Sequence, residues 1–217
     1  MGQIRQHGGM TVLHPLAANG NDLPLPGAEL WFAPDWLEAG QADALFTLLL
    51  ERVAWETHRI RMFGRMVDSP RLSCWMGDAG TAYTYSGTRF EPRPWPSPVL
   101  EAVRARLADE LGGAFNSALA NRYRDGRDYM GWHSDNEATL GPRPVIASLS
   151  LGATRRFVLK PRQDASHGTL GLDLPHGSLL VMRGETQSNY KHALPRTARP
   201  VGERINLTFR RILDAAD

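Results

Sequence analysis

The second half of the chain is a series of short apolar runs separated by turn signals, and this pattern constrains the fold more than any other feature. The runs cover residues 120–123, 145–151, 156–159, 169–174, 178–182 and 205–209. Asp125-Gly126, His167-Gly168 and His176-Gly177 lie between them. Short β-prone runs bounded by glycine turns are typical of antiparallel strands. The pattern therefore predicts an antiparallel sandwich or jelly roll in this half.

Two helical patterns precede these strands. Pro34-Asp35 stands before apolar residues at helical spacing that continue to Leu50, which predicts a capped amphipathic helix. Ser97-Pro98 opens a second pattern of this kind, and Gly112-Gly113 ends it. Helices followed by many strands predict the α+β class for the chain.

Length and composition indicate a single domain. A chain of 217 residues suits one hydrophobic core. Residues 1–27 are rich in Gly, Pro and Asn and lack the apolar stretch of a signal peptide, so we predict a flexible arm there and one domain over 28–214. No apolar run is long enough to span a bilayer, so we expect no membrane partner. The single cysteine, Cys74, excludes a disulfide framework and favours a reducing cytoplasm.

The basic residues are almost all arginines. The net charge is only +2, with 25 Lys and Arg against 23 Asp and Glu, and the only lysines are Lys160 and Lys191. A GC-rich genome explains such a bias, because its codons favour arginine. Binding of phosphates or carboxylates by the planar guanidinium also explains it. Both readings stay open on composition alone.

Three residues could hold a metal ion. His133 and Asp135 are two positions apart, so on a strand their side chains would face the same side. His192 stands in a polar segment shortly before the last predicted strand and could supply a third ligand. Two histidines and one carboxylate form the facial triad of non-haem iron(II) oxygenases, which leaves coordination positions open. The alternative is a turn aspartate beside a surface histidine.

The last predicted strand carries two arginines on one face. Alternation over residues 204–210 places Arg204, Asn206, Thr208 and Arg210 on one side and apolar residues on the other. Such a face suits a pocket for a dicarboxylate, because an arginine can bind a carboxylate through two hydrogen bonds. A solvated strand face would show the same alternation, and the two readings stay open at this point.

Several motifs in the same order resemble the AlkB family of oxidative nucleic-acid dealkylases. The resemblance extends from about Trp55 to Ile212 and is closest to the branch that acts on double-stranded DNA. It rests on blocks at 70–71 (PR), 83–87 (YTYSG), 121–126 (NRYRDG), 133–137 (HSDNE), 146–153 (IASLSLGA), 176–180 (HGSLL), 192–195 (HALP) and 204–210 (RINLTFR). Blocks in a fixed order are far more specific than any one of them.

The resemblance implies a fold and a cosubstrate. The fold is a double-stranded β-helix, or jelly roll, with a catalytic core over about 115–212, N-terminal helices and a nucleotide-recognition hairpin lid over about 55–90. His133, Asp135 and His192 would hold Fe(II). The cosubstrates would be 2-oxoglutarate and O2. The cosubstrate-binding residues would be Arg204 and Arg210 for the two carboxylates of 2-oxoglutarate, helped by Asn121, Tyr123 and Asn206.

The resemblance also implies the reaction. A ferryl oxidant would hydroxylate the alkyl carbon of N1-methyladenine or N3-methylcytosine in DNA, and the alkyl group would leave as an aldehyde. Glu137 and Arg155 match family positions near the damaged base. Tyr83 and Tyr85 lie in the segment that covers the flipped base, where an aromatic face can stack on it.

A predicted hairpin over residues 55–66 has Phe63-Gly64 at its tip. Four arginines accompany it in the sequence, namely Arg59, Arg61, Arg65 and Arg71. In the duplex-acting branch an apolar tip fills the gap left by the extruded base, at an unstacking cost of a few kcal/mol. We therefore expect Phe63 and Arg71 to contact alkylated duplex DNA, and we expect a monomer. A phenylalanine packed inward is the alternative for Phe63.

Two other functions fit part of this pattern. The same oxygenase core could act on RNA or on a substrate other than a nucleic acid. A base-binding protein without turnover is the other possibility, although an intact triad with both arginines disfavours it.

Overall fold

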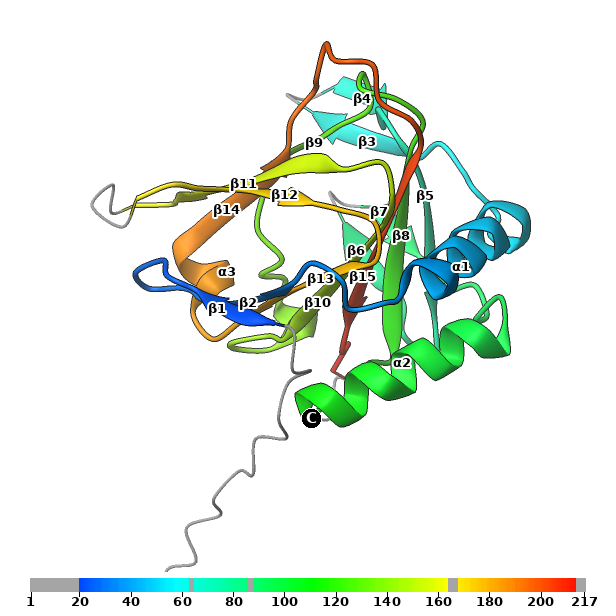
Figure 1. The fold of residues 1–217 in the computed structure, drawn as a ribbon, viewed down its shortest axis with the longest axis horizontal. Helices are drawn as coiled ribbons and strands as arrows, with labels where there is room; N and C mark the ends of the chain where they lie inside the picture. The colour runs from blue at the N-terminus through cyan, green and yellow to red at the C-terminus, as the bar shows by residue number, and fades with distance from the viewer. Residues whose placement is uncertain (1–19, 63–64, 86–87, 164–167, 214–217) are drawn as a thin grey trace, which may run out of the picture.

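The computed structural model describes residues 20–62, 65–85, 88–163 and 168–213, and within these ranges it describes the backbone alone for residues 60–62, 65–66, 83–85 and 88–90. Its larger sheet has seven strands, each antiparallel to its neighbours (Figure 1). In spatial order they are β1 (Asn21–Leu23), β2 (Glu29–Ala33), β13 (Ser178–Arg183), β10 (Ile146–Gly152), β15 (Arg204–Arg210), β8 (Ser117–Tyr123) and β5 (Leu72–Gly77).

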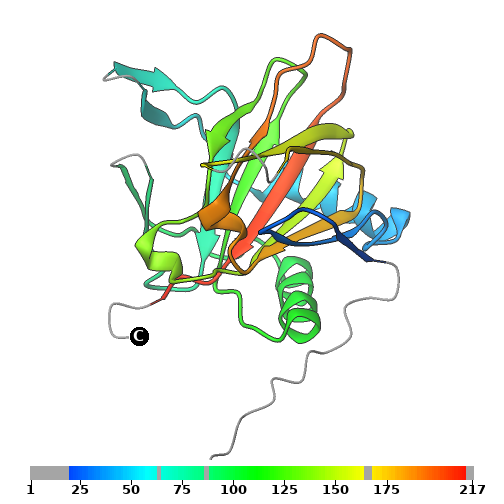
Figure 2. The same ribbon diagram turned by 90° about the vertical axis from the view of Figure 1, so that its left-hand side faces the viewer.

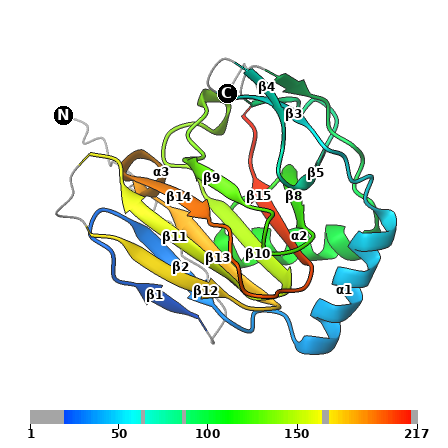
Figure 3. The same ribbon diagram turned by 90° about the horizontal axis from the view of Figure 1, so that it is seen from above.

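A smaller antiparallel sheet lies over the larger one. Its strands are, in spatial order, β12 (Leu170–Leu174), β11 (Arg155–Pro161), β14 (Tyr190–Leu194) and β9 (Met130–His133). Figure 3 shows the two sheets as layers, with β9 at the edge of the smaller sheet. The predicted α+β fold with a jelly-roll core is confirmed, because strands distant in sequence alternate between two facing antiparallel sheets.

Two helices cover the outer face of the larger sheet, away from the smaller one (Figures 1 and 3). They are α1 (Ala39–Arg52) and α2 (Pro98–Leu111). Leu45 and Leu49 of α1 and Leu107 of α2 pack in one buried cluster with Leu149 and Leu207 of the sheet. A second buried cluster fills part of the space between the sheets.

The second helix follows its sequence signals and the first departs from them. In α2, the Ser97 hydroxyl accepts the Leu100 N–H at 3.3 Å, and Gly112 ends the helix in a left-handed conformation with φ 65°. The predicted cap at Pro34-Asp35 was wrong, since α1 begins at Ala39 without a side-chain cap. The Leu37 N–H donates to the Gly177 carbonyl at 3.0 Å, which holds that segment against the sheet instead.

Two hairpins project from one side of the molecule (Figure 2). The first pairs β3 (Arg59–Met62) with β4 (Arg65–Asp68), and the second pairs β6 (Tyr83–Tyr85) with β7 (Thr88–Phe90). The hairpin predicted over residues 55–66 is therefore present, with its pairing shifted toward residue 68. Phe63-Gly64 lies outside the described residues.

The N-terminal boundary differs from the prediction. Asn21–Leu23 pairs with Leu30–Phe32 at the edge of the larger sheet, so the last part of the predicted arm over 1–27 belongs to the sheet. Residues 1–19 lie outside the described part of the chain, and the flexible arm stays a prediction for them. The single domain over 28–214 also stays a prediction. Among the described residues, no helix has the length and apolar character needed to cross a membrane.

Candidate metal and cosubstrate site

Two histidines and one aspartate converge where the smaller sheet faces the larger. His133 ends β9 and pairs with His192 of β14, so both rings lie on the inner face. The Asp135 carboxylate is 4.0 Å from His133 Nε2 and 3.9 Å from His192 Nε2. One donor atom of each residue lies within 4.8 Å of the others, and this is the one such group of His, Cys, Asp and Glu found in the described residues.

Asp135 does not lie on the same strand as His133, although strand alternation was predicted to place both side chains on one face. Strand β9 ends at His133, and its pairing with β14 shifts register between His192 and Leu194. Asp135 therefore lies in the segment after the strand. Its backbone N–H donates to Gln187 Oε1 at 2.9 Å. In a β-sheet, such an N–H would donate to a backbone carbonyl of the neighbouring strand.

Both histidines are held in the neutral form that a metal requires. Burial lowers the pKa of His133, although the Asp135 carboxylate acts in the opposite direction. Burial, with the nearby His133, lowers the pKa of His192 to about 3. His133 Nδ1 is 2.8 Å from the Gly131 carbonyl, so its proton is used there and Nε2 is left with a lone pair.

The aspartate is held ionised. Burial alone would raise the pKa of Asp135, but the positive charge of Arg210, together with its hydrogen bond, holds that pKa below the ordinary value. Arg210 Nη2 donates to Asp135 Oδ1 at 2.8 Å, and both side chains are buried. The structure thus places Arg210 against the metal-binding group, as well as on the wall of the cavity beside it.

The predicted polar face of β15 lines this cavity. Arg204, Asn206, Thr208 and Arg210 all face it, and all four are buried, so this strand face is not a solvated surface. Asn121 and Tyr123 of the neighbouring β8 complete the polar wall. The five residues predicted to bind the cosubstrate therefore share one cavity with the three predicted metal ligands; these five are Asn121, Tyr123, Arg204, Asn206 and Arg210.

Arg204 carries a buried charge that protein atoms satisfy only in part. The residue is 1% exposed, and Nη2 donates to Ser150 Oγ at 2.9 Å. Its Nε and Nη1 are buried and have no hydrogen-bond partner among the described residues. Burial lowers the pKa of Arg204 to about 10. A buried guanidinium with free donors fits a carboxylate, which would satisfy both its charge and its hydrogen bonds.

The two asparagines are held by protein partners. Asn206 Nδ2 donates to Ser148 Oγ at 2.9 Å, and Asn206 Oδ1 accepts the Thr208 hydroxyl at 3.1 Å. Asn121 Oδ1 accepts Arg71 Nε at 2.6 Å. These bonds fix the shape of the polar wall.

The residues that were predicted to contact the damaged base or the DNA lie in separate parts of the fold. Glu137 is half-buried just before a short 3-10 helix (Ala138–Leu140), so the continuing strand that would have aligned it with Asp135 is absent. Arg71 is buried and donates to Asn121 and Ser69, and its contact with DNA stays a prediction. For Tyr83 and Tyr85 the structure gives only their place in β6, since their side chains lie outside the described atoms.

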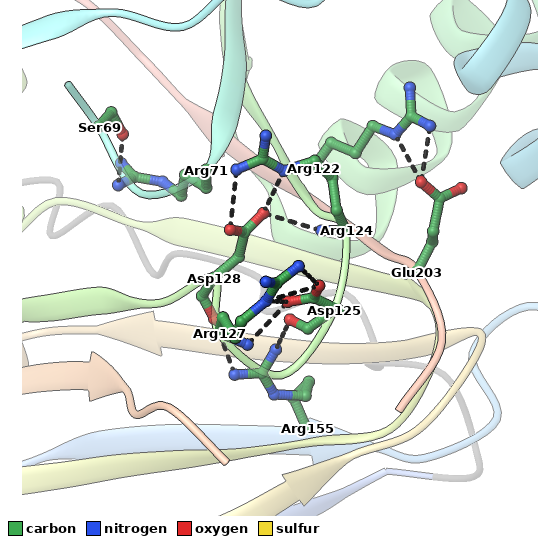
Figure 4. Close-up of polar contacts among 9 residues, drawn as sticks. All are labelled: Ser69, Arg71, Arg122, Arg124, Asp125, Arg127, Asp128, Arg155 and Glu203. Atoms are coloured by element: carbon green, nitrogen blue, oxygen red, sulfur yellow. Dashed lines mark hydrogen bonds and ion pairs between the residues drawn. The ribbon is translucent and has the colours of Figure 1, made fainter. Parts of the chain in front are cut away.

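Arg155 supports two loops and does not line the cavity. Its guanidinium donates to the carbonyls of Asp125 and Asp128 at 3.0 Å each, as Figure 4 shows, and to the Pro195 carbonyl at 2.8 Å. The residue is 3% exposed. Arg155 therefore lies beneath the loops that follow β8 and β14, with its Cζ 5.9 Å from the centre of the Tyr123 ring on the cavity wall, and its role near the substrate stays a prediction.

Two residues of the site were missed in the sequence. Ser150 is the partner of Arg204, and it alternates with apolar residues on the buried strand β10, a signal that could have found it. Gln187 holds the backbone of Asp135 from a four-residue helix, α3 (Thr186–Asn189). No spacing rule links Gln187 to Asp135, because they are 52 positions apart.

The fold and the site together define the class of protein. The family model described as the 2OG-Fe(II) oxygenase superfamily matches residues 29–210, so the chain belongs to that superfamily. It is an Fe(II)- and 2-oxoglutarate-dependent dioxygenase, and its cosubstrates are 2-oxoglutarate and O2. Neutral imidazoles, an ionised carboxylate and a buried arginine with free donors fit these groups.

Within this class, the chain belongs to the AlkB family. It is 41% identical over 184 residues to the mouse DNA oxidative demethylase ALKBH2, covering 80% of this chain and 76% of the relative. The Arabidopsis thaliana protein of that name is 39% identical over 211 residues, with 86% and 67% covered. Rat alpha-ketoglutarate-dependent dioxygenase alkB homolog 3 is 37% identical over 186 residues, with 82% and 62% covered.

A solved structure supports the fold. The structure of OsALKBH1 aligns with a TM-score of 0.58 at 17% identity, covering 88% of this chain and 99% of that one. At this identity the likeness concerns the fold alone.

Proposed function

We propose that this chain removes alkyl groups oxidatively from N1-methyladenine and N3-methylcytosine in DNA, as a direct-reversal repair enzyme. The observation that carries the proposal is the buried His-Asp-His group beside the incompletely satisfied Arg204. The relatives named DNA oxidative demethylase, at about 40% identity over most of the chain, support DNA as the substrate.

In this proposal His133, Asp135 and His192 hold the iron, and Arg204 binds a carboxylate of 2-oxoglutarate. When bound, iron with 2-oxoglutarate and O2 supplies the oxidant that hydroxylates the alkyl carbon. Arg210 keeps Asp135 ionised and lies within reach of the same cavity. The hydroxymethyl group then leaves as formaldehyde with release of the hydroxyl proton, and the electron pair of the broken C–N bond returns to the base nitrogen as its lone pair.

Apolar side chains on the cavity wall limit access of water to the site. Met130, Phe157, Met182 and Leu194 line the cavity together with the ligands. The Phe157 ring lies 5.3 Å from the His192 ring, centroid to centroid, and restrains the plane of that ligand. Burial of Arg204 and Asp135 strengthens their charge interactions, because the surroundings screen charge less than water does.

We further propose duplex DNA as the preferred form of the substrate and a monomer as the active form. A base alkylated on its pairing edge must be flipped out of the helix before it can reach a buried centre. Glu137, Tyr83 and Tyr85 are the proposed contacts to the flipped base, and Phe63 is the proposed wedge. The cytoplasm remains the compartment that the single Cys74 favours.

The same chemistry on RNA, or on a substrate other than a nucleic acid, is the alternative. It is separated from the proposal by comparing turnover of N1-methyladenine in duplex DNA, single-stranded DNA and RNA at one salt concentration, because phosphate binding depends on salt. The proposal predicts the highest kcat/KM on the duplex. Faster turnover of RNA would reverse the assignment.

Single substitutions test the proposed residues. His133→Ala and Arg210→Ala should each abolish measurable demethylation, because the first removes an iron ligand and the second leaves Asp135 without its cation. Lys191→Ala is the matched control, since Lys191 is exposed and adjacent to His192 in the sequence. Normal demethylation by either of the first two variants would contradict the proposed site.

A further inference from the structure

We propose that Gln187 on helix α3 is the positioning residue for Asp135. It sets where the aspartate stands relative to the two histidines and thereby determines metal affinity. The inference rests on the proposed metal site, and it concerns a residue outside the metal ligands and outside the cavity wall.

The first observation is that Asp135 lies after the end of β9 and takes no part in the hydrogen bonds of the sheet. Because β9 ends at His133, the Asp135 N–H has no neighbouring strand as its acceptor. Gln187 Oε1 accepts it at 2.9 Å, and both residues are buried, with Gln187 1% exposed. A buried N–H without an acceptor is costly, so this bond favours one backbone position for the aspartate.

The second observation fixes the direction in which the Gln187 amide faces. Its Nε2 is 3.5 Å from Met182 Sδ, which is a weak acceptor. A reversed amide would place Nε2 against the Asp135 N–H, where two donors would meet. The oxygen therefore faces Asp135, and the interaction is specific for a side chain with an acceptor at this place.

The third observation is that α3 is itself held in place by hydrogen bonds to the larger sheet, so it can hold Asp135 in a defined position. The Thr186 hydroxyl donates to the Arg183 carbonyl at 2.6 Å and accepts the Glu29 N–H at 2.9 Å, which ties α3 to two strands of the larger sheet. The Tyr190 hydroxyl donates to the Pro26 carbonyl at 2.6 Å.

Helix α3 also connects the metal-ligand segments to each other. It leads directly into β14, which carries His192. From the other segment, the Ser134 hydroxyl donates to the Tyr190 carbonyl at 2.7 Å, beside the bond from Asp135 to Gln187. One anchored element thus positions Asp135 and His192 together. Outer contacts of this kind change metal affinity by about 10–100-fold when they are lost.

The test compares two substitutions in the metal-free full chain. Gln187→Met keeps the length of the side chain and removes the acceptor, whereas Gln187→Glu keeps an acceptor for the Asp135 N–H. Gln41→Leu, at an exposed position on α1, is the control. Mn(II) binding is measured from the EPR signal of the free ion, and the unfolding midpoint of each metal-free protein is measured in urea.

We expect Q187M to bind Mn(II) about 10–100-fold more weakly than the unsubstituted chain. Q187E and the control should stay within about threefold, since Q187E still offers an oxygen to the backbone N–H. The KM for 2-oxoglutarate at saturating Fe(II) should change less than Mn(II) affinity in Q187M, because Arg204 is untouched. A role in packing alone would lower the unfolding midpoint and leave Mn(II) affinity unchanged.

Unchanged Mn(II) affinity in Q187M, or an equal loss in Q187M and Q187E, would overturn the inference. If Q187M does not fold, Q187E decides the question, because a tenfold loss there contradicts the acceptor role and retained affinity supports it. Failure of the unsubstituted chain to bind Mn(II) would instead contradict the proposed metal site. Binding without DNA demethylation would contradict only the proposed function.

Discussion

At the scale of single residues, the site is built from groups whose burial is costly in the absence of ligands. Arg204 is fully buried with donors left free, and two neutral histidines face one ionised aspartate. Such groups destabilise the unliganded protein and are stabilised when a cation and an anion bind beside them. This opposition between stability and binding can be measured at Arg204.

Arg204→Met should separate stability from cosubstrate binding. Removing a buried, incompletely paired charge should leave the free energy of unfolding of the metal-free protein unchanged or raise it. The KM for 2-oxoglutarate should rise by about 10–100-fold, because a hydrogen bond to a charged group contributes about 1.5–3 kcal/mol. Urea unfolding and a 2-oxoglutarate titration measure the two effects. Strong destabilisation with an unchanged KM would show that Arg204 is a structural residue.

Stability of the metal-free protein should fall as the pH falls from 7 to 5. His192 has a pKa of about 3 in the folded chain, below its ordinary value of 6.5, because it is buried. The unfolded chain therefore binds protons in this range that the folded chain does not, which favours unfolding at the lower pH. Urea midpoints at the two pH values measure the effect. His192→Asn should reduce the dependence, and a dependence that is the same with and without His192 would contradict the assignment.

At the scale of elements, the features that depend on residues close together in the sequence could be predicted from it. The cap of α2 and the two faces of β15 depend on positions one to four residues apart, and both were predicted correctly. The start of α1 and the end of β9 depend on distant partners, Gly177 for Leu37 and Gln187 for Asp135, and both were missed. Secondary-structure propensity reflects only local sequence, so contacts with distant residues can override it at the ends of helices and strands.

Arg155 shows how one distant side chain supports two elements. It donates to the Asp125 carbonyl in the loop after β8 (Figure 4) and to the Pro195 carbonyl in the loop after β14. Gly126 allows the close approach of the two loops, because a Cβ there would overlap Thr197. The two loops follow strands that carry Tyr123 and His192, so their connection affects the ends of the site.

Arg155→Met should lower the free energy of unfolding by about 1–3 kcal/mol, since it leaves the buried Asp128 carbonyl and two part-buried carbonyls without a donor. Arg156→Met is the neighbouring control, because Arg156 is exposed and its 3.2 Å contact with Asp173 is a surface ion pair. Urea unfolding compares the two. An unchanged stability of Arg155→Met together with a higher KM for DNA would contradict the structural role and support the substrate-binding role predicted for Arg155.

At the scale of the whole molecule, the order of strands brings together residues that the sequence separates. Arg204 meets Ser150, 54 positions away, and Arg71 meets Asn121, 50 positions away. Ordered motifs indicated the family, and through it the members of the site. The partners of those members could not be derived, because sheet order and register determine them and no local pattern encodes either.

Phosphate contacts by arginines would make DNA binding by the whole molecule depend on salt. If the proposed DNA substrate binds through arginines, its dissociation constant should rise steadily as salt increases from about 50 to 200 mM, because phosphate contacts release counterions. Anisotropy of a labelled duplex carrying N1-methyladenine measures this. An affinity that does not depend on salt would indicate a substrate recognised without phosphate contacts.

The most direct test of the central claim is the mass of one duplex oligonucleotide that carries a single N1-methyladenine. It is incubated with the full chain, Fe(II), ascorbate, 2-oxoglutarate and air. The account predicts loss of the mass of one methylene group, and no loss when either iron or 2-oxoglutarate is omitted. A retained methyl group with accumulating succinate would contradict the proposed substrate, and absence of both products would contradict the proposed site.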